Sequence, residues 1–424
     1  MNARIKSYFD ILSNLLRINS VESEALPDAP FGKGNKEALD FVLDLLKGYG
    51  FKTKNLEGFS GWGEIGEGEK MFAVLGHTDV VPEGNPKDWT FPPYGGEIHN
   101  DILYGRGAED DKGPLLACIF AAKELLDEGF TPKMRLRFIV GADEESGWVC
   151  LDRYFKTEEV PYLGFSPDAD FPVIYCEKGI VHHTVEVPCP KKIKAISGGT
   201  RANVVPDYAS ATVQNCEGEE FVLEATGVSS HASRPENGEN AIVKLLGQII
   251  GTCAKKSGDC LTEKLYKAFS NCDGSELNLK LEDESGPLTI NIGLVEKVGE
   301  KLIFTTDIRH PVTVPREKIT EILQNALPFS KVTDIFSHPP LYVPKDHFLV
   351  KGLLEAYEEV TGVKGEPIAI GGGTYARSLP CGVAFGPIFP GDKSSIHELD
   401  ECVSAANFEK CVAIYKAALK KLIF

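Results

Sequence analysis

Apolar residues in the first 170 positions are spaced in two ways, which predict helices and buried strands in alternation. Leu39, Val42 and Leu46 recur at helical intervals and predict an amphipathic helix over residues 35–48. Short continuous apolar runs, typical of strands buried on both faces, occupy residues 71–75, 134–140 and 162–166. Further helices are predicted over residues 112–128 and 147–155. This alternation predicts an α/β fold, with a mostly parallel sheet covered by helices on both faces.

The pattern changes near residue 178 and returns to its first form near residue 346. Alternating apolar and polar positions predict strands over residues 181–187, 194–197, 208–213, 221–228, 288–295 and 302–309. Helical spacing predicts helices over residues 240–252 and 316–327, and again over 349–361 and 408–422. We therefore predict a discontinuous first domain, residues 1–177 and 341–424, with an α+β domain inserted at residues 178–340.

Composition supports two domains and excludes several partners. The chain has 424 residues, of which 42% are hydrophobic, and this length exceeds what one ordinary core holds. A formal net charge of −17 would repel a phosphate backbone, which argues against nucleic acid as a partner. No apolar run is long enough to cross a bilayer, so we expect no membrane contact. The 11 cysteines form no Cys-x-x-Cys pair, and the first twenty residues do not read as a signal peptide, which favours a cytoplasmic protein with reduced thiols.

Residues with metal-ligand chemistry follow the predicted strands. They are His77 and Asp79, Asp110 and Asp111 at the start of a helix, Asp143 to Glu145, and Asp168. Taken alone, each has an ordinary explanation: a turn histidine, a helix N-cap at Asp111, acidic residues favoured by a helix dipole, or a turn carboxylate. A cysteine-based zinc site or nucleophile is disfavoured, because the thiols read as small apolar residues.

The joint occurrence of these residues favours a metal site. The carboxyl ends of parallel strands meet at one edge of a sheet, where open α/β folds place their ligands. Neighbouring carboxylates repel each other, and a cation relieves that repulsion. One histidine with several carboxylates suits zinc, manganese or cobalt, and two half-sites that share an aspartate would form a two-metal hydrolase. Asp79 is placed to hold His77 through its other ring nitrogen.

Taken together, these segments resemble the M20 family of metallopeptidases, and most closely its PepV-like dipeptidase branch. The resemblance covers nearly the whole chain. It implies that His77, Asp110 and Asp168 bind one divalent cation, and that Asp110, Glu145 and His397 bind a second. It also implies Zn²⁺, with Mn²⁺ and Co²⁺ as alternatives, and a cis peptide bond after Asp110. Glu144 is the implied general base, and Asp79 supports His77.

The inserted domain resembles the lid of that family. His231 matches a lid histidine that polarises the scissile carbonyl, although by itself it reads as a turn residue. Asn203 and Arg309 match groups that clamp the substrate carboxylate, and Arg309 suits a bidentate pair; the alternative is a surface strand residue. The implied glycine-rich substrate loop consists of Gly371, Gly372, Gly373, Thr374 and Arg377.

The resemblance implies a dipeptidase that hydrolyses the amide bond of short peptides with a free C-terminal carboxylate. Two alternatives stay open. One is another amidase of the same family, an N-acyl amino acid deacylase or a succinyl-diaminopimelate desuccinylase, and the other is a non-catalytic binding protein on the same fold. The insert at residues 178–340 is larger than the compact lids through which many members dimerise, so a monomer is favoured over a homodimer.

Overall fold

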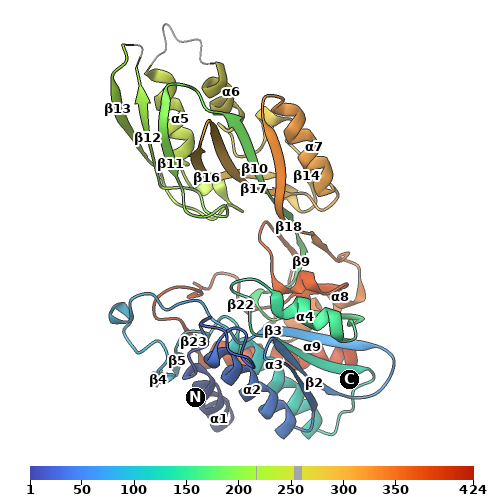
Figure 1. Cartoon of the computed structure of the whole chain (residues 1–424). Helices are drawn as coiled ribbons and strands as arrows, with labels where there is room; N and C mark the ends of the chain where they lie inside the picture. The colour runs from blue at the N-terminus through green and yellow to red at the C-terminus, as the bar shows by residue number, and fades with distance from the viewer. Residues whose placement is uncertain (216, 253–259) are drawn as a thin grey trace. The chain divides into compact units, whose positions relative to one another are not determined.

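The protein is described by a computed structural model that covers residues 1–215, 217–252 and 260–424 (Figure 1). It divides into two compact units. Unit 1 comprises Met1–Tyr175, Tyr342–Ile368 and Thr374–Phe424. Unit 2 comprises Cys176–Leu341 and Ala369–Gly373. The second segment of unit 2 was predicted to belong to the first domain. It groups with unit 2 because its backbone pairs with that unit: the carbonyl oxygen of Ile370 accepts the N–H of Lys178.

Unit 1 is built on a mixed sheet whose centre is parallel. The strand order is β1-β2-β6-β3-β7-β21-β9-β19, and β20 also pairs with β9. The pairs β3–β6, β3–β7 and β21–β7 are parallel, whereas β1–β2, β2–β6 and β21–β9 are antiparallel. The strands are β1 (Lys52–Leu56), β2 (Ser60–Ile65), β3 (Met71–His77), β6 (Arg135–Gly141), β7 (Leu163–Ser166), β9 (Ile174–Glu177), β19 (Leu341–Tyr342), β20 (Ile368–Ile370) and β21 (Gly382–Ala384). The predicted α/β class is confirmed, and the parallel pairs join the neighbouring strands β6, β3, β7 and β21 in the middle of the strand order.

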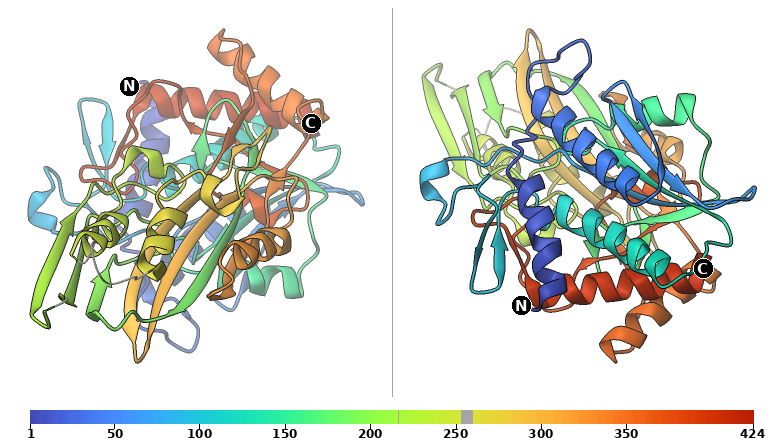
Figure 2. Two further views of the ribbon diagram at one scale, coloured as in Figure 1. Left: turned by 90° about the horizontal axis from the view of Figure 1, so that it is seen from above. Right: turned by 90° about the horizontal axis from the view of Figure 1, so that it is seen from below.

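Helices cover both faces of this sheet. They are α1 (Ala3–Leu16), α2 (Lys33–Gly48), α3 (Lys112–Asp127), α4 (Val149–Thr157), α8 (Phe348–Thr361) and α9 (Ala405–Ile423). Helices α1, α3 and α9 contact one another and lie side by side in the right-hand view of Figure 2. The opposite face packs against α4 and the short 3₁₀ helix η4 (Tyr375–Ser378), with Trp62, Leu75 and Tyr154 in the shared core.

Short strands and loops complete unit 1. Residues 81–101 contain the 3₁₀ helix η1 (Pro86–Asp88) and the strand β4 (Glu97–His99). A three-stranded sheet joins β4 to β5 (Ile102–Tyr104) and β23 (Cys402–Ser404). A two-stranded sheet joins β8 (Ala169–Asp170) to β22 (Pro387–Ile388).

Unit 2 has an antiparallel sheet in the order β13-β12-β11-β16-β17-β10-β18. Its strands are β10 (Gly179–Pro188), β11 (Ile193–Gly198), β12 (Tyr208–Gln214), β13 (Glu220–Thr226), β16 (Thr289–Val298), β17 (Lys301–His310) and β18 (Lys331–His338), with the small hairpin β14 (Glu282–Asp283) and β15 (Gly286–Pro287) beside it. Its helices are α5 (Ala241–Gly251), α6 (Cys260–Ala268) and α7 (Arg316–Ala326), with the 3₁₀ helices η2 (Pro235–Asn237) and η3 (Ser275–Leu277). Leu245, Leu302 and Phe304 lie in the core between sheet and helices. This arrangement is the α+β pattern expected of the inserted segment.

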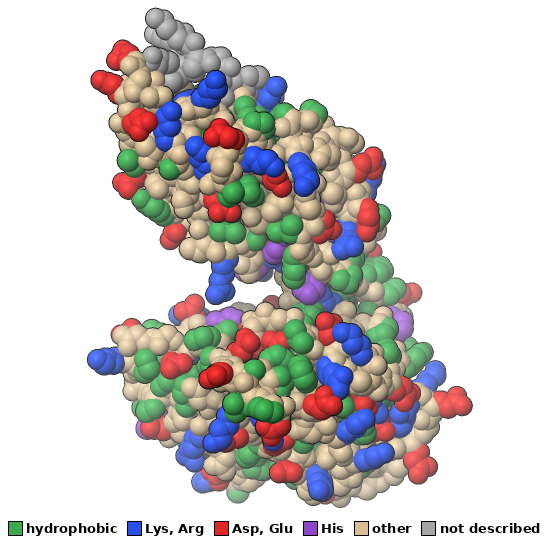
Figure 3. All heavy atoms as spheres, viewed as in Figure 1, with side chains coloured by type: hydrophobic (Ala, Val, Ile, Leu, Met, Phe, Trp, Pro, Cys, Tyr) green, Lys and Arg blue, Asp and Glu red, His purple; other side chains and the backbone are tan. Residues whose placement is uncertain are grey.

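The surface and the helices of the described chain fit the composition. On the face shown in Figure 3, acidic and basic side chains are intermixed on both units. Among the described helices, none combines the length and the apolar character that a bilayer crossing requires.

A glycine in the central strand β7 has no room for a side chain. A Cβ atom added at Gly164 would lie 2.1 Å from the carbonyl oxygen of Ala73 on the neighbouring strand. We expect Gly164→Ala to lower the free energy of unfolding by about 1–3 kcal/mol, because the backbone of a packed sheet must shift. Gly48→Ala is the matched control, since an added Cβ there meets nothing within 4 Å and a helical alanine is favoured. Thermal melting of both variants tests this, and equal melting temperatures would contradict it.

Candidate metal centre

Neighbouring parallel strands bring the predicted ligands to one edge of the main sheet. Strand β3 ends at His77, and the turn after its partner β6 carries Glu144 and Glu145. Strand β7, parallel to β3 on its other side, is followed by Asp168. Asp110 stands two residues before the start of α3. The carboxyl ends of these strands form the edge at which a sheet of this kind places its ligands.

Asp110 lies between two histidines. Its Oδ1 is 3.0 Å from Nε2 of His77, and its Oδ2 is 3.1 Å from Nε2 of His397. On the side of His77, Oδ2 of Asp168 is 3.5 Å from the same Nε2. On the side of His397, Oε1 of Glu145 is 3.1 Å from Nε2. One carboxylate therefore faces both histidines through separate oxygens, which is the arrangement of a bridging ligand.

Two groups of ligand atoms stand out among the described residues, and within each group the atoms lie no more than 4.8 Å apart. They are His77, Glu144 and Asp168, and Asp110, Glu145 and His397. The second group is the set that the resemblance implied for one cation. The first contains Glu144 in the place of Asp110, so the predicted base stands directly beside the predicted ligands.

The buried atoms at the centre of the site fit a divalent cation. His77 Nε2 and Asp110 Oδ1 are buried, and neither makes a hydrogen bond of acceptable geometry, although they are 3.0 Å apart. Leaving such atoms unsatisfied in the interior is costly. Imidazole and carboxylate groups that converge without pointing at each other can all donate electron pairs to one cation, so the donor set fits zinc or a similar metal.

The electrostatics of the chain lead to the same conclusion. Burial, with the neighbouring acidic groups, raises the pKa of Glu144 well above its usual range, and burial also raises the pKa of Glu145 and Asp168. Contacts with Asp110 and Glu145 raise the pKa of His397 to about 10. The acidic groups of this cluster thus repel one another in the chain alone, and bound cations would relieve that repulsion.

Two aspartates beside the ligands make contacts that differ in detail from those expected. Nδ1 of His77 lies 3.1 Å from the backbone carbonyl of Asp79 and 3.4 Å from its Oδ1, the side on which Asp79 was expected to support the ring, and Oδ2 of Asp79 accepts the N–H of Glu145 at 2.9 Å. Asp111 occupies the N-cap position of α3 but makes no capping bond. Its Oδ2 accepts the backbone N–H of His77 at 3.1 Å, so it orients the ligand strand. The peptide bond between Asp110 and Asp111 is cis, as the resemblance implied.

The predicted lid residues lie in unit 2. His231 is exposed, and its Nδ1 accepts the backbone N–H of Ser233 at 3.1 Å. This leaves the proton of the neutral ring on Nε2, where it is available as a donor. The backbone carbonyl of Asn203 accepts the N–H of Ala232 at 3.0 Å, so Asn203 and His231 belong to adjoining turns.

Arg309 is buried in unit 2, so its alternative interpretation as a surface strand residue is wrong. Its Nε and Nη2 form a bidentate pair with Asp307, at 2.6 and 2.8 Å, because residues 307 and 309 share one face of β17. Its Nη1 donates to the carbonyl of Gly371 at 3.3 Å. Asp307 therefore engages the Nε and Nη2 edge of Arg309, and Nη1 contacts the glycine loop. The role of Arg309 in binding the substrate carboxylate stays a prediction.

The predicted substrate loop is divided between the units. Gly371, Gly372 and Gly373 belong to unit 2, whereas Thr374 and Arg377 are buried in unit 1 with the ligands. Between the latter two, Tyr375 packs edge-on against the ring of His77, with centroids 5.9 Å apart. Tyr375 is thus a neighbour of the site that sequence reasoning missed.

Two buried or half-buried glutamates near the site were also missed. Glu401 is fully buried and accepts the backbone N–H of Asp110 at 3.2 Å, and Glu109 accepts the N–H of Ser395 at 2.6 Å. Their partners lie about 290 residues away along the chain. Glu109 directly precedes the predicted pair Asp110 and Asp111, whereas local sequence carries no signal for Glu401.

Comparison with known proteins now decides the family. The model of peptidase family M20/M25/M40 matches residues 73–421, a span that holds every residue of the two ligand groups. The chain belongs to this family. It is therefore a peptidase of the M20 type, a class of hydrolases that use divalent metal ions.

Relatives and solved structures of the M20 family match the chain along its length. A Bacillus subtilis protein named "Putative dipeptidase YtjP" is 39% identical, over 96% of this chain and 95% of its own. An M20 family metallo-carboxypeptidase from Sulfolobus solfataricus has a TM-score of 0.62 at 16% identity, covering 99% of both chains. The aminoacylhistidine dipeptidase from Vibrio alginolyticus has a TM-score of 0.62 at 14% identity, covering 98% of this chain and 96% of its own. The structural likeness shows a shared fold.

Proposed function

We propose that this M20 peptidase is a dipeptidase that works with two divalent cations. The observation that carries the proposal is the Asp110 carboxylate, which faces His77 through one oxygen and His397 through the other. His77, Asp110 and Asp168 would hold one cation, and Asp110, Glu145 and His397 the other. When bound, the cations supply Lewis acidity, which lowers the pKa of water and polarises the peptide carbonyl.

Glu144 is the proposed general base. It lies beside His77 and Asp168, yet the bridging geometry does not require it as a ligand. As the water oxygen attacks the amide carbon, Glu144 takes the water proton. It then delivers that proton to the nitrogen of the leaving amine as the carbon–nitrogen bond breaks. Trp148 Nε1 donates to Oε1 of Glu144 at 3.2 Å, which orients the carboxylate for both transfers.

Residues of unit 2 are proposed to bind the substrate. His231 carries its proton on Nε2 and would donate to the developing oxyanion. Asn203 and the loop Gly371–Gly373 would supply amide donors to the C-terminal carboxylate, together with Thr374 and Arg377 from unit 1. Arg309 would act by holding Gly371, since its Nε edge is paired with Asp307.

Dipeptides are the proposed substrates because the B. subtilis relative of 39% identity is named as a dipeptidase. Zinc is the proposed metal, and manganese or cobalt suits the same ligands. We also propose a monomer in the cytoplasm. The large inserted unit supports the monomer, and the cytoplasm is supported by the thiols of Cys118, Cys150 and Cys411, which are buried and form no disulfide.

A substrate panel tests the proposal. Metal-loaded enzyme would be given several dipeptides, a tripeptide, the same dipeptides with an amidated C-terminus, N-acetyl amino acids and N-succinyl-diaminopimelate. We expect hydrolysis of the unblocked dipeptides, and a loss of kcat/KM of about tenfold or more on amidation, because the carboxylate loses its charge-assisted hydrogen bonds. Cleavage of the acylated amino acids alone would keep the metal chemistry but make the enzyme a deacylase.

A further inference from the structure

Two loops that are far apart in the sequence meet beside the bridging carboxylate. Residues 106–110 carry Asp110, and residues 394–401 carry His397. Neither ligand lies on a helix or a strand, and His397 has a φ of 60°, a backbone conformation outside regular structure. Something other than secondary structure must therefore hold Asp110 Oδ2 and His397 Nε2 3.1 Å apart.

Glu401 reaches from the second loop into the first. Its Oε1 accepts the backbone N–H groups of Gly107, Glu109 and Asp110, at 3.1, 2.9 and 3.2 Å. Its Oε2 accepts Nη1 of Arg106 at 2.8 Å. Glu401 is fully buried, and these four donors satisfy a charge that would otherwise be costly in the interior.

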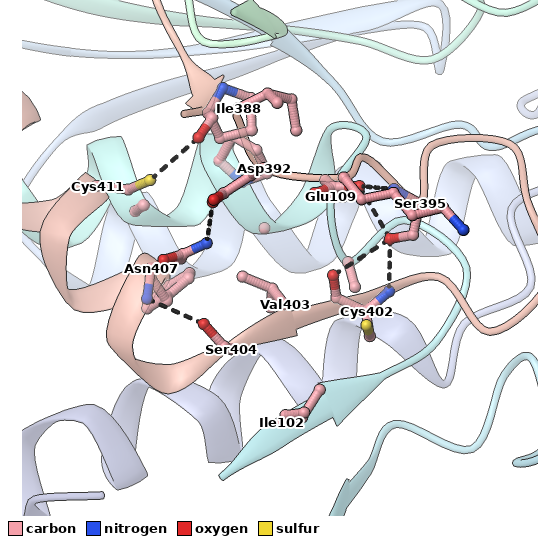
Figure 4. A pocket seen from close by; sticks show the side chains of 17 residues that line it. Ile102, Glu109, Ile388, Asp392, Ser395, Cys402, Val403, Ser404, Asn407 and Cys411 are labelled. Carbon is pink, nitrogen blue, oxygen red and sulfur yellow. Dashed lines mark hydrogen bonds between the residues drawn. The ribbon is translucent and has the colours of Figure 1, made fainter. Parts of the chain in front are cut away.

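Glu109 reaches in the opposite direction. Its Oε2 accepts the backbone N–H of Ser395 at 2.6 Å, the hydroxyl of Ser395 at 2.9 Å and the hydroxyl of Ser394 at 3.2 Å. Figure 4 shows Glu109 beside Ser395, which is bonded in turn to the backbone of Cys402. Each loop thus offers one carboxylate to the backbone of the other.

A cavity lies behind these contacts, so the two loops are not packed against other side chains on that side. Glu109, Ser395 and Cys402 line a hollow of about 310 Å³ in unit 1 (Figure 4). Because space rather than side chains lies on this side, hydrogen bonds restrain residues 394–395 there, those to Glu109 together with those between Ser395 and Cys402. A shift there would carry His397 with it.

We propose that Glu109 and Glu401 form a reciprocal clasp that positions Asp110 against His397 and so sets the metal affinity of the site made by Asp110, Glu145 and His397. The inference rests on the proposed function, since it takes these three residues as ligands. Glu109 and Glu401 are positioning residues that touch no reacting atom. Residues that orient metal ligands in this way typically change metal affinity by about 10- to 100-fold when they are lost.

The first test measures metal affinity by competition with a chelator. In Glu109→Ala, the affinity for one of the two metal ions should fall by about 10- to 100-fold. The affinity for the other should stay nearly unchanged, because His77 and Asp168 do not depend on residues 394–395. Glu109→Gln keeps an oxygen acceptor and should recover most of the affinity. The matched control is Glu64→Ala, which removes a partly buried ion pair with Arg137 in the same unit and should leave both affinities unchanged.

The second test needs no metal. Amide hydrogen exchange in the metal-free protein should speed up by about 10- to 100-fold at Ser395 in Glu109→Ala, because a hydrogen bond to a charged acceptor is lost. Glu401→Ala should likewise speed up amide exchange at Gly107 and Glu109. If that variant does not fold, Glu401→Gln, which keeps one of the two side-chain oxygens, should show the same change. The Glu64→Ala variant should leave these amides unchanged.

The outcomes separate the clasp from the proposed function. If Glu109→Ala changes neither the amide exchange of Ser395 nor the metal affinities, the clasp is overturned. An equal loss of affinity for both metal ions also overturns it. Wild-type enzyme that takes up fewer than two equivalents overturns the assignment of ligands, and the exchange of Ser395 then still decides whether Glu109 holds that loop.

Discussion

We expect Glu144→Gln to abolish nearly all turnover while leaving the metal content unchanged. The substitution keeps the shape of the side chain and removes its ability to take a proton, so we expect kcat on a dipeptide to fall by about 10²- to 10⁴-fold. Metal content should stay at the wild-type value, because the bridging geometry joins Asp110 to the two histidines without Glu144. Steady-state kinetics and metal analysis of the same preparation measure both quantities.

A comparison with Glu145→Gln makes this result specific. Glu145 and Glu144 are neighbours in one turn, but Oε1 of Glu145 lies 3.1 Å from the ligand nitrogen of His397. Glu145→Gln should therefore lose metal as well as activity. If Glu144→Gln kept more than about a hundredth of wild-type kcat, the carboxylate would not be the base.

Asp110→Asn is expected to have the second large effect, through both cations at once. An amide presents one oxygen and one NH₂ group, so it cannot face both His77 and His397 with an anionic oxygen. We expect the bound metal to fall below one equivalent, and kcat/KM to drop by roughly 10³-fold or more, which corresponds to several kcal/mol of lost charge stabilisation.

Asp168→Asn is the control for the bridging role. Asp168 lies 3.5 Å from Nε2 of His77 and belongs to the ligand group on that side alone. The Asp168→Asn variant should lose one equivalent of bound metal and keep the metal ion held by Glu145 and His397. If Asp110→Asn and Asp168→Asn lost the same amount of metal, Asp110 would not be shared.

Local sequence was enough to predict the part of the site that follows the strands. His77 and Asp168 each stand two residues after the end of a predicted buried strand, and parallel strands carry such residues to one edge. The helices of the first domain could also be predicted from the sequence, because their apolar residues are regularly spaced. The ligand and base roles of these residues stay predictions, which the variants above test.

Other parts depend on contacts that no local pattern encodes. His397 follows no strand, and only the resemblance pointed to it. Glu401 acts on amides about 290 residues away, so its role appears only when the chain is folded. Strand β18 was missed because it lies at an edge of its sheet and much of it is exposed, which weakens the alternation. The pair of Arg309 with Asp307 was visible in principle, since residues two apart on a strand share a face.

The most direct test of the central claim is a metal titration of chelator-stripped wild-type enzyme, with hydrolysis of an unblocked dipeptide measured at each step. We predict no activity without metal, a rise as Mn²⁺ or Zn²⁺ is added, and a plateau at two equivalents per chain. Activity that survives complete removal of metal, or a plateau at one equivalent, would contradict the account.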